Sequence, residues 1–123
     1  MRIALALTLM IAALILWGTL SPPGPPGPGL PLSDKQMHAL AFALLVLPLG
    51  WQNIRHTVWL FPEALALGGA IELVQPMVGR GAEWADFLAD ALGIATGLAP
   101  GWLRRRIGQH KSLSRKTPGA RPV

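Results

Sequence analysis

Side chains that could do chemistry are few in this sequence, and most of them fall in a few short stretches. They are Asp34, Lys35, His38, Glu72, Gln75, Arg80, Glu83, Asp86 and Asp90. Histidine is the natural general acid or base near neutral pH, and a carboxylate can orient it or share its proton. Lysine and arginine can instead hold a phosphate or a carboxylate by charge-assisted hydrogen bonds. These residues therefore suggest either acid–base catalysis or anion binding.

Spacing places several of these side chains on shared helix faces. The pairs, three or four residues apart, are Asp34 with His38, Glu72 with Gln75, and Asp86 with Asp90. Residues at these spacings are neighbours on a helix. Glu72 and Asp90 each lie about one turn inside an apolar stretch. A carboxylate at the centre of a bilayer costs roughly 2.5–3.5 kcal/mol, and less near its edge, so it usually faces a partner or a wet cavity.

The signatures of other chemistries are absent from the sequence. It contains no nucleophile elbow, P-loop, zinc-protease motif or dinucleotide fingerprint. The lack of cysteine excludes disulfides and thiolate metal sites. One histidine with several carboxylates could hold a hard divalent ion, but no ligand spacing code accompanies them. We therefore predict neither a metal nor a cofactor.

The composition indicates a membrane protein. Of 123 residues, 51% are hydrophobic and only 14% are charged, against about 25% charged in ordinary soluble domains. The mean hydropathy is +0.41, which excludes a disordered chain. A chain this short cannot bury so large an apolar excess in an aqueous fold.

Four stretches can be interpreted as transmembrane helices. Their ranges are 1–20, 33–52, 58–75 and 84–103. Ser33 and Gln36 form a capping-box pattern at the start of the second. The first could also be a cleaved signal peptide, but a Pro/Gly-rich linker over 21–32 follows it in place of a small-residue cleavage site, which favours an uncleaved span. Residues 104–123 form a basic tail that we expect to be disordered.

The distribution of basic residues predicts the topology. With a cytoplasmic N-terminus, nine Lys and Arg residues lie on the cytoplasmic side and only Lys35 and Arg80 lie outside, as the positive-inside rule requires. The fold class is therefore an all-α bundle of four transmembrane helices with both termini cytoplasmic. The basic tail then anchors this topology beside anionic lipids, and no nucleic-acid partner is predicted. The polar residues of the three later helices gather at the outer face.

Small residues continue one polar face of the last predicted helix. Gly93 and Gly97 follow Asp86 and Asp90 at helical spacing. Such a stripe lets another helix approach closely. The approaching helix could belong to the same chain or, in a homo-oligomer, to a second copy.

The ordered set of polar residues and glycines resembles the VanZ-like family. It reads Asp34-Lys35-x-x-His38-x-x-x-Phe42, then Glu72-x-x-Gln75, then Arg80-x-x-x-x-x-Asp86-x-x-x-Asp90-x-x-Gly93-x-x-x-Gly97. This resemblance implies a core of three transmembrane helices over 33–103, in a small multi-pass protein of the bacterial cytoplasmic membrane. The family's namesake is associated with resistance to the glycopeptide teicoplanin. The family commonly has asparagine where this chain has Asp90, so the chain carries an extra carboxylate there.

The first functional hypothesis is a binding or accessory role for a cell-envelope lipid. Lys35 and Arg80 would hold a phosphate or carboxylate of a lipid-linked intermediate. Glu72, Gln75 and Asp90 would meet its sugar or peptide part, and Asp34 and Asp86 are further candidate ligand-binding residues. The motivation is the outer-face cluster together with the glycopeptide link implied by the resemblance.

Two alternatives remain open. In the first, the protein is a membrane hydrolase or transferase acting on a lipid head group, with His38 as general acid or base and Glu72 or Asp90 as its partner. In the second, the polar cluster only fixes helix packing. Glu72 would then pair with Arg80 or Lys35.

Overall fold

The structure, a computed structural model, describes residues 1–22, 31–52 and 57–115. Within these ranges it contains four α-helices, one short 3-10 helix and no strand. The bounds are α1 Arg2–Leu20, α2 Asp34–Gln52, α3 Thr57–Val74, η1 Gln75–Val78 and α4 Trp84–Arg115. The predicted all-helical class and the order of the four helices are confirmed. Most of the predicted linker (23–30 of 21–32), the predicted loop around 53–56 and the last part of the tail (116–123) lie outside the described residues.

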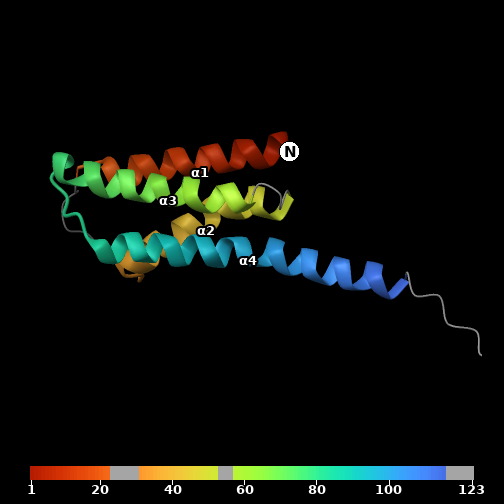
Figure 1. Cartoon of the computed structure of the whole chain (residues 1–123). Helices are drawn as coiled ribbons and strands as arrows, with labels where there is room; N and C mark the ends of the chain where they lie inside the picture. The colour runs from red at the N-terminus through yellow and green to blue at the C-terminus, as the bar shows by residue number, and fades with distance from the viewer. Residues whose placement is uncertain (23–30, 53–56, 116–123) are drawn as a thin grey trace, which may run out of the picture.

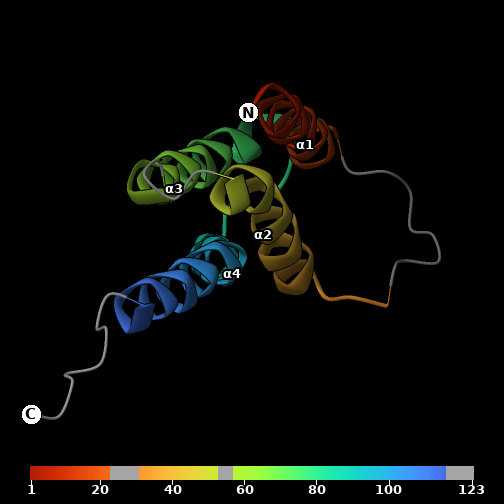
Figure 2. The same ribbon diagram turned by 90° about the vertical axis from the view of Figure 1, so that its right-hand side faces the viewer.

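The helices run alternately in opposite directions along one axis (Figure 1). Seen from the end at which the chain begins, α2 lies between α1 and α4, and α3 lies beside it (Figure 2). The most extensive contact is between α2 and α4, and α2 also contacts α1 and α3. The helix ends at Leu20 and Val74 therefore share one end of the bundle with the helix starts at Asp34 and Trp84.

The start of α2 is determined by a capping box. The backbone N–H of Ser33 donates to Gln36 Oε1 at 2.9 Å, and the backbone N–H of Gln36 donates to Ser33 Oγ at 3.3 Å. These two bonds satisfy donors that the first turn of a helix leaves free. The capping box that the sequence predicts is confirmed, and it sets the position of Lys35 and His38 on α2.

The glycines of α4 bring its backbone against that of α2. A Cβ on Gly93 or Gly97 would press on the backbone carbonyl of Ala39 or Ala43. The stripe therefore serves close helix packing, as predicted, and its partner is α2 of the same chain. A homo-oligomer built through Gly93 and Gly97 would require α2 to move away, so these glycines are not a free surface.

The segment between α3 and α4 begins as a 3-10 turn, η1. Pro76 has no N–H to continue an α-helix, and η1 ends at Val78, where Gly79 follows with a left-handed φ of 78°. Arg80 N–H then donates to the Gln75 carbonyl at 3.1 Å. This turn brings Arg80 back toward the bundle.

The predicted end of the fourth helix is wrong. The helix continues from Leu103 to Arg115, so residues 104–115, which we expected to be disordered, are helical. Arginine is a strong helix former, and the Arg104 guanidinium lies 4.9 Å from the centre of the Trp51 ring on α2. This cation–π contact holds the continuing helix against the end of α2.

Large apolar side chains are distributed both inside the bundle and over its outside. Phe42, Ile71 and Ile94 are at most 1% exposed. Exposed large hydrophobic residues nevertheless occur on all four helices. Two stretches, Arg2–Leu20 and Val58–Val78, are long and apolar enough to cross a membrane, whereas α2 and α4 do not meet that measure. Composition and length therefore support two of the four predicted spans.

Candidate functional site

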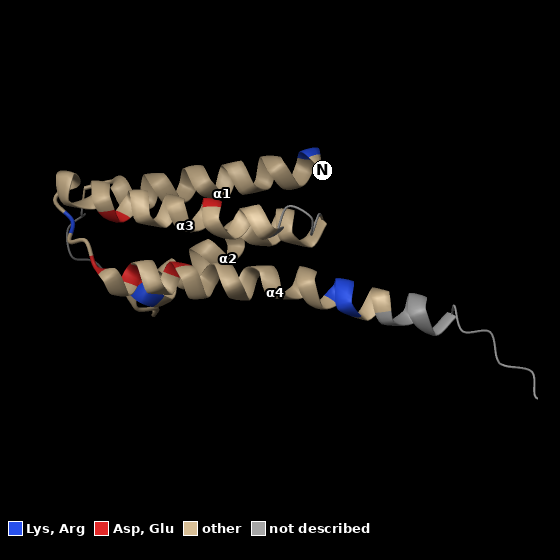
Figure 3. Cartoon of the chain, viewed as in Figure 1, with Lys and Arg blue, Asp and Glu red and all other residues tan. Residues whose placement is uncertain are grey.

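The polar side chains identified in the sequence gather at one end of the bundle. Figure 3 shows acidic and basic residues together where α1 and α3 end and where α2 and α4 begin. Three of the ionisable side chains are almost fully buried: His38 is 7% exposed, Asp86 2% and Asp90 0%. We refer to these residues, with Asp34, Lys35, Glu72, Gln75, Arg80 and Glu83, as the polar cluster.

A histidine–aspartate pair joins α2 to α4. His38 Nδ1 and Asp90 Oδ1 are 2.9 Å apart, and both side chains are buried. The partner of His38 is therefore Asp90, one of the two carboxylates that the catalytic hypothesis requires. Glu72, the other one, has no contact of this kind with His38 among the described residues. The close packing of α2 on α4 holds this pair together.

Asp90 also faces α3, at Gly68, which is not among the residues predicted from the sequence. Its second oxygen, Oδ2, is buried and accepts no hydrogen bond from the described residues. A Cβ added at Gly68 would lie only 2.6 Å from this oxygen. Gly68 therefore makes room for the carboxylate. The signal was available in the sequence, since Gly68 lies one helical turn before Glu72 on the same face.

Lys35 is engaged by carboxylates. Its Nζ lies 2.7 Å from Glu83 Oε2 and 3.4 Å from Asp86 Oδ1. The hydrogen bond and positive charge of Lys35 hold the pKa of the Glu83 carboxyl below its usual range. A cation held in this way is poorly placed to bind an anionic ligand as well, which weakens the role expected for Lys35.

Glu72 and Gln75 make polar contacts with the backbone. Glu72 Oε2 accepts a hydrogen bond from the Glu83 N–H at 2.8 Å, and Gln75 Nε2 donates to the Thr19 carbonyl at 3.4 Å. The ion pair of Glu72 with Arg80 or Lys35 that the packing hypothesis invoked is absent from the described residues. One oxygen of each side chain, Glu72 Oε1 and Gln75 Oε1, is buried without a hydrogen-bond donor.

Arg80 closes the cluster from the loop side. Its Nε donates to the Ser21 carbonyl at 3.0 Å, which ties the loop to the end of α1. Within the described residues no carboxylate lies within ion-pair distance of its guanidinium. Arg80 therefore remains the cation of the cluster that is best placed to meet an anion.

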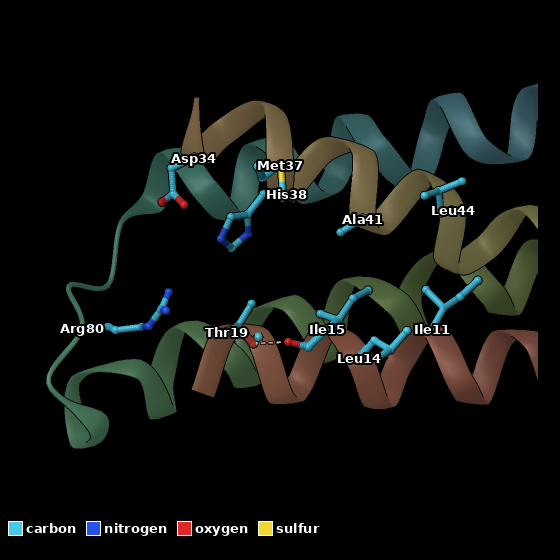
Figure 4. A pocket seen from close by; sticks show the side chains of 11 residues that line it. Ile11, Leu14, Ile15, Thr19, Asp34, Met37, His38, Ala41, Leu44 and Arg80 are labelled. Atoms are coloured by element: carbon cyan, nitrogen blue, oxygen red, sulfur yellow. Dashed lines mark hydrogen bonds between the residues drawn. The ribbon is translucent and has the colours of Figure 1, made fainter. Parts of the chain in front are cut away.

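An apolar groove of about 450 Å³ leads to the cluster between α1 and α2. Its walls are mostly aliphatic and include Ile11, Leu14, Ile15, Ala41 and Leu44. At its polar end Figure 4 shows Asp34 and the ring of His38 on one side and Arg80 on the other. The groove is thus amphipathic, with a long apolar part and one charged end.

A second, polar hollow of about 430 Å³ adjoins the groove. It is lined by Asp34, Gln75, Gly79, Arg80, Gly81, Glu83 and Asp86. Asp34 and Arg80 line both spaces. Beside them, ligand atoms of Asp34, His38 and Asp86 lie within 4.8 Å of one another, a spacing from which a metal ion could be held. A ligand in this region would meet carboxylates, an imidazole and one guanidinium.

No protein-family profile, curated protein or solved structure matches this chain.

Proposed function

We propose that the chain is a four-span protein of the bacterial cytoplasmic membrane that binds an anionic lipid head group at the outer face, as expected from its resemblance to the VanZ-like family. The observation that carries this proposal is the amphipathic groove between α1 and α2, which ends at Arg80 and His38. The aliphatic walls suit an acyl or prenyl chain, and the guanidinium suits a phosphate. A lipid-linked cell-envelope intermediate has both parts.

The exposure pattern supports membrane insertion of all four helices. Leu40 and Leu44 on α2 are 48% and 46% exposed, and Leu88 and Leu92 on α4 are 62% and 66% exposed. The buried side chains of the same helices include His38, Asp86 and Asp90. Monomeric soluble proteins rarely leave extended apolar surfaces in contact with water. Apolar residues outside and paired polar residues inside favour a lipid environment for α2 and α4 as well.

The contacts of α1 favour its retention as part of the bundle. Thr8 Oγ1 donates to the Leu45 carbonyl of α2 at 3.2 Å, and Ile15 belongs to the buried core. Ile15 also lines the groove. Cleavage of α1 as a signal peptide would remove one wall of the proposed binding site.

The groove can be blocked at a position that tolerates a larger residue. Gly18 lines the groove, and a Cβ added there meets no atom within 4 Å. Gly18→Leu should therefore fill the groove and leave the fold intact. Ala13→Leu, on an exposed position of α1 outside the groove, is the matched control. Arg80→Gln removes the guanidinium charge at the polar end.

Native mass spectrometry of the full chain, released gently from its own membrane, tests the proposal. The parent protein and Ala13→Leu should retain a phosphate-containing lipid. Gly18→Leu and Arg80→Gln should lose it, and Gly18→Leu should do so at unchanged thermal stability. Equal retention of bulk phospholipid by all four proteins would refute head-group binding in this groove.

The His38–Asp90 pair favours a second function, a hydrolase or transferase acting on the bound head group. Asp90 would accept a hydrogen bond from the Nδ1–H of His38, and Nε2 of His38 would take a proton from water or from a hydroxyl nucleophile. Turnover of the retained lipid should then disappear in His38→Gln although the lipid stays bound. If the parent protein leaves the head group intact over long incubation with its lipid, this second function is wrong.

A further inference from the structure

His38 has one ring nitrogen engaged and one directed away from its partner. Nδ1 contacts Asp90 Oδ1 at 2.9 Å, and no described residue forms a hydrogen bond with Nε2. The side chain is only 7% exposed, and Figure 4 shows its ring turned toward Asp34 and Arg80. A metal-binding histidine almost always gives its other N–H to a carboxylate or carbonyl, which fixes the tautomer and the ring orientation. The surroundings of His38 match that pattern.

Two carboxylates lie next to the imidazole. Asp34, one turn earlier on α2, and Asp86 on α4 offer oxygens that lie, with a His38 ring nitrogen, within 4.8 Å of one another. Asp34 is exposed, whereas the Asp86 side chain is only 4% exposed. The three groups therefore come together from two helices. Asp34 lies at the surface, and His38 and Asp86 lie in the interior.

Buried oxygens without donors provide an independent indication of a bound cation. Gln75 is 3% exposed and lines the polar hollow together with Asp34 and Asp86, yet its Oε1 accepts no hydrogen bond within the described residues. Asp86 Oδ1 is also buried without a hydrogen bond. Lys35 Nζ is 3.4 Å from it, which is longer than an ordinary charge-assisted hydrogen bond of about 2.7–2.9 Å. Unpaired buried acceptors are costly, and a metal ion or its bound water would satisfy these.

We propose that Asp34, His38 and Asp86 bind one divalent metal ion and that Asp90 is a positioning residue, which orients the imidazole through Nδ1. Two carboxylates and one imidazole form a donor set suited to Mn²⁺ or Zn²⁺. The inference does not depend on what occupies the groove. The proposed site reverses the prediction that the chain binds no metal. The third ligand, Asp86, comes from α4, so its position beside Asp34 and His38 could not be inferred from spacing along the chain.

The geometry requires only a small adjustment. Metal–ligand distances of about 2.0–2.2 Å place ligand atoms about 3–4.4 Å apart, slightly closer than the 4.8 Å within which the three atoms lie. Asp34 is exposed and can rotate to close this gap, whereas His38 and Asp86 are held by packing. The remaining coordination positions would be taken by water or by a ligand in the polar hollow.

Manganese titration of the full chain, with tags removed and metals stripped by a chelator, tests the site. Electron paramagnetic resonance should show one bound Mn²⁺ per chain, with the ¹⁴N modulation of a coordinated imidazole. Asp34→Asn and His38→Gln should weaken binding at least tenfold, and Asp90→Asn about 10–100-fold, as outer-shell partners of metal ligands typically do. Glu63→Gln, an exposed carboxylate of α3 outside the cluster, is the matched control and should leave binding unchanged.

Lys35 offers a sharper test, because its ammonium group lies beside Asp86 and would compete with the metal. Lys35→Gln should therefore bind Mn²⁺ more tightly than the parent protein does. Unchanged or weaker binding in Lys35→Gln would place the ion away from Asp86 and overturn the three-residue site. The proposal is also overturned by the absence of binding below about 1 mM, by missing ¹⁴N modulation, or by full binding in Asp34→Asn, whose exposed position should leave folding intact.

Discussion

Replacing Gly93 by alanine tests the helix packing that holds His38 opposite Asp90. The added Cβ would press on the backbone carbonyl of Ala39. A backbone carbonyl cannot rotate away as the end of a flexible side chain can. The contact is relieved only if α2 and α4 separate, which would also stretch the His38–Asp90 pair.

The size of the effect follows from two opposing contributions. Overpacking a tight interior costs about 1–3 kcal/mol, and the upper end applies here because the neighbour is backbone. Alanine in place of glycine inside a helix recovers about 0.5–1 kcal/mol. Gly93→Ala should therefore lower the free energy of unfolding by about 2 kcal/mol, which is roughly a 30-fold change in the unfolding equilibrium.

Unfolding by denaturing detergent, followed by tryptophan fluorescence, measures this change. Gly108→Ala is the matched control, because a Cβ there meets no atom within 4 Å. That variant should be neutral or more stable by about 0.5–1 kcal/mol. If Gly93→Ala proved as stable as Gly108→Ala, the helices would not be in backbone contact, and the account of how the site is positioned would be wrong.

Two further predictions concern the edge of the cluster. Ser33→Ala removes the capping bond to the Gln36 N–H and should lower thermal stability by about 0.5–2 kcal/mol, whereas an unchanged melting temperature would show that the cap is not formed. For Glu83, whose pKa is lowered by Lys35, the pair stabilises the fold above the usual glutamate pKa. This stability should be lost as the pH falls through the lowered pKa. The free energy of unfolding, measured as a function of pH, should show this loss in the parent protein and not in Lys35→Gln.

Element positions were largely predictable because they depend on local signals. The capping box at Ser33 places the start of α2 within one residue. Pro76 and the glycines that follow it mark the end of the third helix. The prediction of a disordered tail from Arg104 is wrong, because a run of arginines also favours a helix. The contact of Arg104 with Trp51, which favours a longer helix, joins two distant parts of the chain.

Pairings within the cluster were less predictable, because they depend on how helices are rotated and offset against each other. Helical spacing places Asp34 and His38 on one face, but it does not decide whether Glu72 or Asp90 meets the imidazole. The offset of α2 on α4 is set by backbone contact at Gly93, and the outcome is the His38–Asp90 pair. The gathering of the polar cluster at one end of the bundle could therefore be predicted from the sequence, whereas the contacts between its members could not.

The proposed metal site and the proposed lipid site in the groove between α1 and α2 would be coupled through charge. Asp34 lines both the groove and the polar hollow, so its carboxylate repels a phosphate held by Arg80. A divalent ion on Asp34, His38 and Asp86 would reverse that repulsion and add a positive charge near the guanidinium. Linkage then requires metal and anionic head group to strengthen each other's binding. Ligation at Nε2 would also prevent His38 from accepting a proton, so metal binding favours head-group recognition over histidine-based catalysis.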